Sequence, residues 1–173
     1  MVYAKVTEKE FEQLAPFREE REKLIKKYHE IDKKTSDQKL AANQFADQSI
    51  DAIRKEQKEA LAGFTKNYLS LRDQIQKTTD SQLGREIQTG EDIEGNNARF
   101  IEEGKKNLKE AEKNYLEGKK NMIKPFDERI EKVKKDRNAS LESFNQDKQI
   151  ALTTFYQDML SLHQKAYKVY IGK

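Results

Sequence analysis

The chain has 173 residues, of which 38% are charged and 35% hydrophobic, and its 34 Lys and Arg residues nearly balance its 31 Asp and Glu residues. This composition is more charged and less apolar than that of an ordinary globular domain, and it is typical of long helices with narrow apolar seams or of disorder. The near balance of charge argues against a dedicated nucleic-acid tail, and the absence of cysteine excludes disulfides and thiolate chemistry.

Helical periodicity dominates the first half of the chain. We expect a first helix over residues 7–33, kinked or restarted at Pro16, then a polar turn at 32–37 with Ser36 as N-cap, and a second helix over 37–79. One uninterrupted helix through this region is the alternative. Apolar or small residues spaced by three or four form a seam in the second helix. Its members are Ala46, Ile50, Ile53, Gln57, Ala60, Phe64, Tyr68, Leu71 and Ile75.

Residues 80–97 interrupt this periodicity and contain three of the seven glycines, so they are the expected main loop. A third helix is expected over 98–123, and Pro125 suits the first turn of a fourth. The fourth helix carries a second seam with the same spacing. Its members are Phe126, Ile130, Val133, Arg137, Leu141, Phe144, Lys148, Ala151, Phe155, Met159, Leu162, Ala166 and Val169.

The two seams resemble each other in sequence. A shift of 91 residues places Phe64 on Phe155 and Leu71 on Leu162, and a shift of 109 places Pro16 on Pro125. We interpret the match as an internal duplication; the alternative is compositional similarity between helices of this kind. The expected fold is all-α, an elongated antiparallel helical hairpin or coiled-coil bundle of three to four long helices. Its domain organisation would be a first helical unit over 1–79, the loop over 80–97 and a second unit over 98–173.

The third helix carries a repeated hexapeptide. Residues 103–108 recur, with one conservative change, at 117–122. Gly104, Ala111 and Gly118 are small residues spaced by seven on its apolar stripe. Because each glycine costs a helix about 1 kcal/mol relative to alanine, we expect another backbone or a large side chain to approach closely there. The alternative is a weak helix.

The other side of this helix is basic. Residues 104–137 contain twelve Lys and Arg against seven Asp and Glu, and several lysines share a narrow arc. These lysines are Lys106, Lys109, Lys113, Lys120 and Lys124. They could contact a nucleic acid or an anionic membrane, or they could form an ordinary solvated face.

Catalytic and metal-binding motifs are missing from the sequence. The residues three before His29 and His163 are Lys26 and Leu160, so neither histidine completes the Glu-x-x-His pair of a di-iron bundle. No zinc cluster, nucleophile elbow or phosphate-binding loop occurs. We therefore expect no enzymatic activity, no cofactor and no small-molecule substrate.

Location is suggested by what the chain ends lack. No signal-peptide core follows Met1 and no stretch of 18 apolar residues occurs, which favours a cytoplasmic or virion-associated protein that is neither transmembrane nor secreted by a cleavable signal. Residues 2–6 and 167–171 are dense in aromatic and branched residues. They could dock on each other or on a neighbouring subunit, or cap the helices.

The most economical function for such a chain is non-enzymatic assembly. Narrow seams bury little, so a protein partner or further copies of the chain would complete the core, as in structural subunits or adaptors of virions and secretion machines. The seam residues expected to make the contact are Ile53, Phe64, Tyr68, Leu71, Phe144, Phe155 and Leu162. Binding of an anionic surface by the lysines is the second hypothesis.

Overall fold

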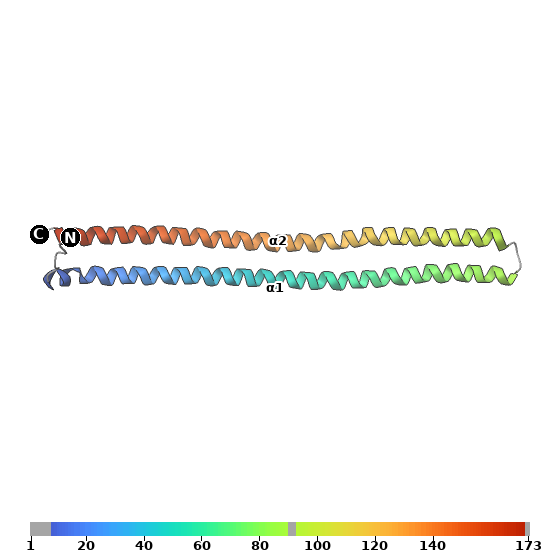
Figure 1. The fold of residues 1–173 in the computed structure, drawn as a ribbon, viewed down its shortest axis with the longest axis horizontal. Helices are drawn as coiled ribbons and strands as arrows, with labels where there is room; N and C mark the ends of the chain where they lie inside the picture. The colour runs from blue at the N-terminus through green and yellow to red at the C-terminus, as the bar shows by residue number, and fades with distance from the viewer. Residues whose placement is uncertain (1–7, 90–92, 172–173) are drawn as a thin grey trace, which may run out of the picture. The chain divides into compact units, whose positions relative to one another are not determined.

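The computed structural model describes residues 8–89 and 93–171, and describes side chains over 12–84 and 95–171. It is an all-α antiparallel hairpin of two long helices packed against each other (Figure 1). Helix α1 covers Glu8–Thr89 with 82 residues, and helix α2 covers Ile93–Ile171 with 79 residues. The described part of the chain therefore has two helices, and the expectation of three to four is wrong.

The turn expected at residues 32–37 is absent because the apolar seam continues through it. Thr35 is buried with 5% exposure on the side of α1 that faces α2. Its hydroxyl donates to the carbonyl of Ile31 at 2.9 Å, and the Ser36 hydroxyl donates to the carbonyl of Asp32 at 3.0 Å. Both hydroxyls are thus satisfied within the helix rather than used as caps. The single uninterrupted helix is the correct alternative.

Prolines and glycines also fail to divide the helices. Pro16 lies inside α1 and Pro125 inside α2, so the expected third and fourth helices are one element. Each proline removes one hydrogen bond of the helix, and the seams on both sides keep the element continuous. The loop expected at 80–97 is wrong over 80–89, which belong to α1, and over 93–97, which belong to α2, whereas residues 90–92 lie outside the described residues. Glycine at position 84 costs only about 1 kcal/mol, too little to end a helix that packs along its length.

The chain forms two compact units, each made of one part of α1 and one part of α2. Within the described residues, unit 1 combines residues 8–47 with 134–171, and unit 2 comprises 48–89 and 93–133. In unit 2, Ile50, Ile53 and Ile130 are buried against each other. In unit 1, Ala46 and Leu162 are the buried apolar residues. These two units do not test the predicted organisation into a first helical unit over 1–79 and a second over 98–173, which stays a prediction.

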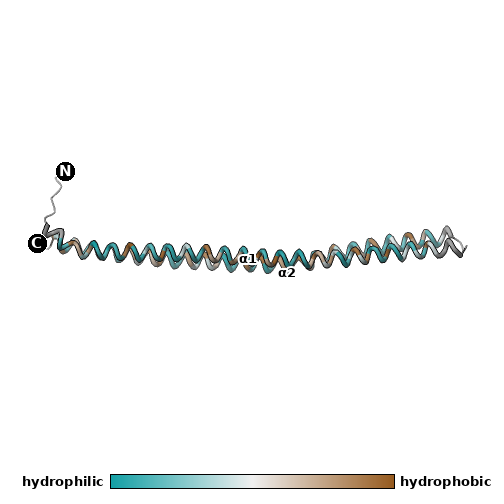
Figure 2. Tube along the Cα trace, turned by 90° about the horizontal axis from the view of Figure 1, so that it is seen from below, coloured by the Kyte–Doolittle hydropathy of each residue, from teal (hydrophilic) through white to brown (hydrophobic). Residues whose placement is uncertain are grey.

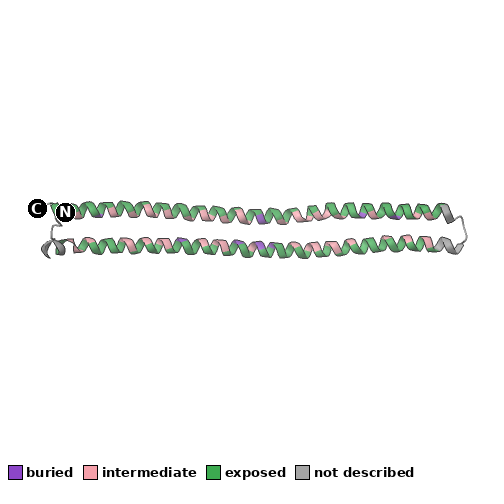
Figure 3. Cartoon of the chain, in the orientation of Figure 1, coloured by how far each residue is buried: buried purple, intermediate pink, exposed green. Residues whose placement is uncertain are grey.

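Burial is shallow in both units. Figure 3 shows exposed residues along both helices, with half-buried positions recurring at intervals and few buried ones. Figure 2 shows the matching pattern of hydropathy, mainly hydrophilic with scattered hydrophobic positions. Over the described residues, neither helix contains a segment apolar and long enough to cross a membrane.

Candidate functional site

An aromatic cluster joins the two helices of unit 2. Tyr115 of α2 stacks on Phe64 with ring centroids 5.4 Å apart and on Tyr68 with centroids 4.3 Å apart. The Tyr115 hydroxyl lies 2.9 Å from the Thr65 hydroxyl, within hydrogen-bonding distance. Three stacked rings and one polar contact thus join the two helices in unit 2.

The small residues of the third expected helix lie against side chains of α1. A Cβ atom added to Gly118 would lie 2.6 Å from Cζ of Phe64, and one added to Gly104 would lie 2.6 Å from Oγ1 of Thr79. Ala111, between them, is buried with 8% exposure. Both glycines therefore occupy positions where α1 side chains reach the α2 backbone, and a larger residue would force a displacement.

The remaining seam residues of unit 2 differ in burial. Ile53 is 6% exposed and belongs to the isoleucine core. Leu71 is 47% exposed, and it borders a shallow hollow of about 280 Å³ together with Tyr68 and Ala111. Leu71 thus lies at the edge of the helix contact rather than within it.

In unit 1 the corresponding aromatic contact is made by Phe155. Its ring stacks on Tyr28 of α1 with centroids 5.0 Å apart. Leu162 is 3% exposed, and Phe144 is half-buried. Phe155 thus holds α2 against α1 within the hairpin, and contact of these seam residues with a partner stays a prediction.

Polar seam positions take different roles. Gln57 and Arg137 are half-buried, and the Arg137 guanidinium donates to Oδ1 of the adjacent Asn138. Lys148 instead forms an ion pair with Asp32 of α1. The hydrogen bond from Lys148 lowers the pKa of Asp32, and the carboxylate raises the pKa of Lys148.

A second ion pair joins the helices in unit 2. Arg129 lies 2.7 Å from the carboxylate of Glu56, and the hydrogen bond from Arg129 lowers the pKa of Glu56. Both pairs join one helix to the other and lie partly in solvent, so they orient the helices more than they stabilise them.

These pairs predict a modest loss of stability in acid. Because the pKa values of Asp32 and Glu56 are lower in the folded state, the contribution is complete at neutral pH and is lost as pH falls through the folded-state values. Urea unfolding from about pH 6 to about pH 2 should show the free energy of unfolding falling less steeply in Asp32→Asn than in the wild type. Equal slopes for the two proteins would contradict a role for the Asp32–Lys148 pair.

The lysine arc of α2 is exposed. Lys106, Lys109, Lys113 and Lys120 have no ion pair with a described residue, while Lys124 lies 3.9 Å from Glu128 one turn along the helix. The arc therefore carries free positive charge at its centre and is partly neutralised at its C-terminal end.

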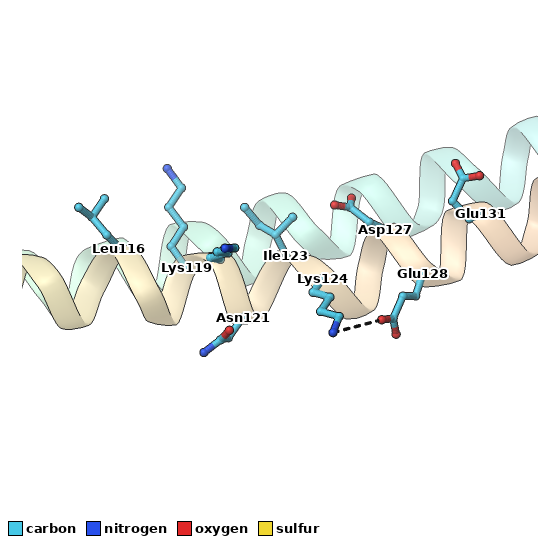
Figure 4. A pocket seen from close by; sticks show the side chains of 9 residues that line it. Leu116, Lys119, Asn121, Ile123, Lys124, Asp127, Glu128 and Glu131 are labelled. Carbon is cyan, nitrogen blue, oxygen red and sulfur yellow. Dashed lines mark ion pairs between the residues drawn. The ribbon is translucent and has the colours of Figure 1, made fainter.

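A shallow groove of about 770 Å³, lined by α2 alone, includes Lys120 and Lys124 at the C-terminal end of this arc (Figure 4). Leu116, Lys119, Ile123, Asp127 and Glu131 project to one side of the helix, and Lys124 and Glu128 project to the other. The groove carries charges of both signs and is formed by a single helix, so its polar groups do not converge on one point where a ligand could bind. Among the described residues, no three His, Asp or Glu side chains are placed to hold a metal ion.

One apolar surface was not anticipated from the sequence. The side of α2 away from the seam in unit 1 exposes Tyr156 at 63%, Leu160 at 60% and Tyr167 at 62%. Together with His163 and Tyr170 these residues follow a spacing of four, three, four and three, so the signal is present in the sequence. The expected docking segment 167–171 is helical and forms the end of this surface, whereas residues 2–6 lie outside the described residues.

The chain matches no family model, and comparisons with curated proteins and with solved structures give no significant match. Its surfaces are therefore the basis for a functional proposal.

Proposed function

We propose that this chain is a non-enzymatic coiled-coil interaction protein, a structural subunit or adaptor of a larger protein complex. The observation that carries the proposal is the exposure of large apolar side chains on ordered helices. Tyr156 is 63% exposed, Leu160 60% and Tyr167 62%, and the three recur along one face of helix α2. Apolar residues gathered on a regular surface mark contact with another molecule, since isolated ones would be distributed without pattern.

The thin seam supports the same proposal. A hairpin of two helices buries one stripe per helix, and most of the stripe residues here remain half-exposed. Long helices gain most of their stability from packing an apolar face. Further helices from a second copy or from another protein would cover the half-exposed residues and complete the core.

An internal duplication is part of the proposal. The 91-residue shift places Phe64, which stacks on Tyr115 of the other helix, on Phe155, which stacks on Tyr28 of the other helix. Each repeat would then supply one helix, and the two units would preserve the same packing in different side chains.

The test is isolation of the tagged chain from its native source at low and at high ionic strength, with bound material identified by mass spectrometry. Contacts through apolar surfaces should persist at high salt, where charge attraction is screened to a few ångströms. We expect multiples of the chain, or another protein in fixed stoichiometry, under both conditions. Recovery of the monomer alone under both conditions would contradict the proposal.

The lysine arc carries a second candidate function, binding of an anionic surface. Its support is the free positive charge of Lys106, Lys109, Lys113 and Lys120. If phosphates bind there, replacing these four residues with glutamine should weaken binding to vesicles with anionic lipid or to duplex DNA. The wild-type affinity should also fall steeply as the salt concentration rises. On a plot of log affinity against log salt concentration, the slope should be roughly minus the number of phosphates contacted. Binding that is independent of salt, or undetectable, would reject this candidate.

A further inference from the structure

The exposed surface of α2 in unit 1 has the geometry of a second helix seam. Tyr156, Leu160, His163, Tyr167 and Tyr170 form a stripe, here called the outer stripe, with the spacing of four and three residues that characterises coiled-coil contacts. At about 100° per residue, this stripe is turned roughly a quarter of the way around the helix from the residues that contact α1. Every member is exposed, so α1 does not cover it.

The outer stripe is bordered by uncharged residues on both sides. One border has Leu152, Met159 and Ala166, of which the last two also belong to the seam against α1, and the other has Gln157, Gln164 and Ile171. In coiled coils these bordering positions normally carry the Lys and Glu residues that select partner and orientation. Here they carry none, in a chain in which 38% of residues are charged.

The lack of charge extends beyond the borders. Asp158 is the one formal charge in residues 149–164, and Lys165 and Lys168 follow toward the C-terminal end of the stripe. Asp158 also borders the small cavity beside Tyr28 and Phe155, on the α1 side of the helix. The outer stripe therefore presents about four helical turns of tyrosine, leucine and histidine with no charge of either sign at its edges.

We infer that the outer stripe binds the same stripe of a second copy of this chain. The inference rests on the proposed assembly function and assigns it a surface and a partner. When a surface pairs with itself, each residue meets a residue of the same patch, so any excess of one charge would repel. The outer stripe satisfies this condition, and the lysine arc of the same helix does not.

The charge pattern separates a second copy from the other occupants of an apolar helix face. A helix that lies on an anionic membrane carries Lys and Arg beside its apolar face. The border positions of the outer stripe contain neither, and Lys165 and Lys168 lie further around the helix, beyond those borders. A charged partner helix would find no opposite charge at the borders to select it. Tyrosine and histidine side chains combine apolar contact with hydrogen bonding, which suits a surface that is exposed to water until the second copy binds.

Matched charge variants of the full-length chain test the inference. One variant carries Leu160→Lys with Tyr167→Lys, and the other carries Leu160→Glu with Tyr167→Glu. Because both residues are exposed, helical content by circular dichroism should stay that of the wild type. The wild type should sediment as a dimer or as a larger assembly of dimers. For each variant alone, the dissociation constant of the dimer should rise at least about a hundred-fold, because like charges then face each other.

Mixing the two variants gives the decisive result. Whether the paired helices run parallel or antiparallel, each lysine then faces a glutamate, so an equimolar mixture should re-form the dimer. A control with Leu69→Lys and Leu116→Lys, exposed leucines in unit 2, should keep the wild-type mass.

Three outcomes would overturn the inference. They are a wild-type monomer at all concentrations, charge variants that keep the wild-type mass, and a mixture that stays monomeric. The proposed assembly function fails separately, when the native isolation recovers neither multiples of the chain nor another protein.

Discussion

Gly118→Leu is expected to lower the free energy of unfolding by about 2–3 kcal/mol, the cost of overpacking a filled site. The reason is the position of Phe64, whose Cζ lies 2.6 Å from where a Cβ atom on Gly118 would stand. That ring is stacked on Tyr115, so displacing it would disturb the aromatic contact between the helices. Gly63→Leu is the matched control, because nothing lies within 4 Å of its added Cβ. It should raise stability by roughly 0.5–1 kcal/mol through helix propensity alone.

Urea denaturation of these variants also tests the cause. Combining Gly118→Leu with Phe64→Ala should cost less than the sum of the two changes, because the smaller residue at position 64 makes room for the leucine. Additive costs would show that the loss at Gly118 arises elsewhere. Gly104→Ala, which would meet Thr79 at 2.6 Å, should fail to give the gain of about 1 kcal/mol expected of glycine to alanine in an open helix.

Tyr115→Ala is expected to cost about 3 kcal/mol, since it removes the central ring of the aromatic cluster. Tyr115 stacks on both Phe64 and Tyr68 and approaches the Thr65 hydroxyl. Tyr115→Phe keeps the rings and should lose only about 1 kcal/mol for the hydroxyl contact.

The control for this prediction is Tyr156→Ala, which removes an equal ring that is 63% exposed. We expect a change within about 0.5 kcal/mol for the monomer. Hydrogen exchange would show where the structure is weakened. Tyr115→Ala should speed the exchange of backbone amides in unit 2, where the aromatic cluster packs. A similar loss for both tyrosines would contradict the assignment of Tyr115 to the helix contact and of Tyr156 to the surface.

The helical class and the positions that face the partner helix follow from residue spacing. Ile50, Ile53 and Ile130 stand where three- and four-residue steps place an apolar stripe, and they are buried. Residue spacing alone decides which side chains share one face of a helix, so this face can be predicted without knowing what the helix packs against. The antiparallel hairpin follows in turn from two such helices joined by a short connection.

Helix ends were harder to predict, because local turn signals compete with packing. Thr35 and Ser36 have the character of a turn, yet a seam that continues through them keeps α1 intact. Pro125 similarly fails to start a new helix. Helix formation is cooperative, so one unfavourable residue costs less than starting a second helix.

The partners of the small residues could not be derived from one helix. Gly104 and Gly118 suggest a close approach, but only the pairing register of α1 and α2 brings Thr79 and Phe64 to them. The outer stripe posed a different difficulty. The seam spacing predicts that Phe155 faces the other helix, and its ring stacks on Tyr28 of α1. The stripe that begins at the adjacent Tyr156 has the same spacing, and spacing alone does not tell which of the two stripes the hairpin buries.

The central claim is that this chain acts by assembling with protein rather than by chemistry on a small molecule. Native mass spectrometry of the purified full-length chain, over a range of concentrations and at two ionic strengths, tests it most directly. We predict a discrete multiple of the 20.3 kDa chain whose population rises with concentration and changes little with salt. A monomer at every concentration would contradict assembly with itself, and a complex that disappears with salt would favour the lysine arc.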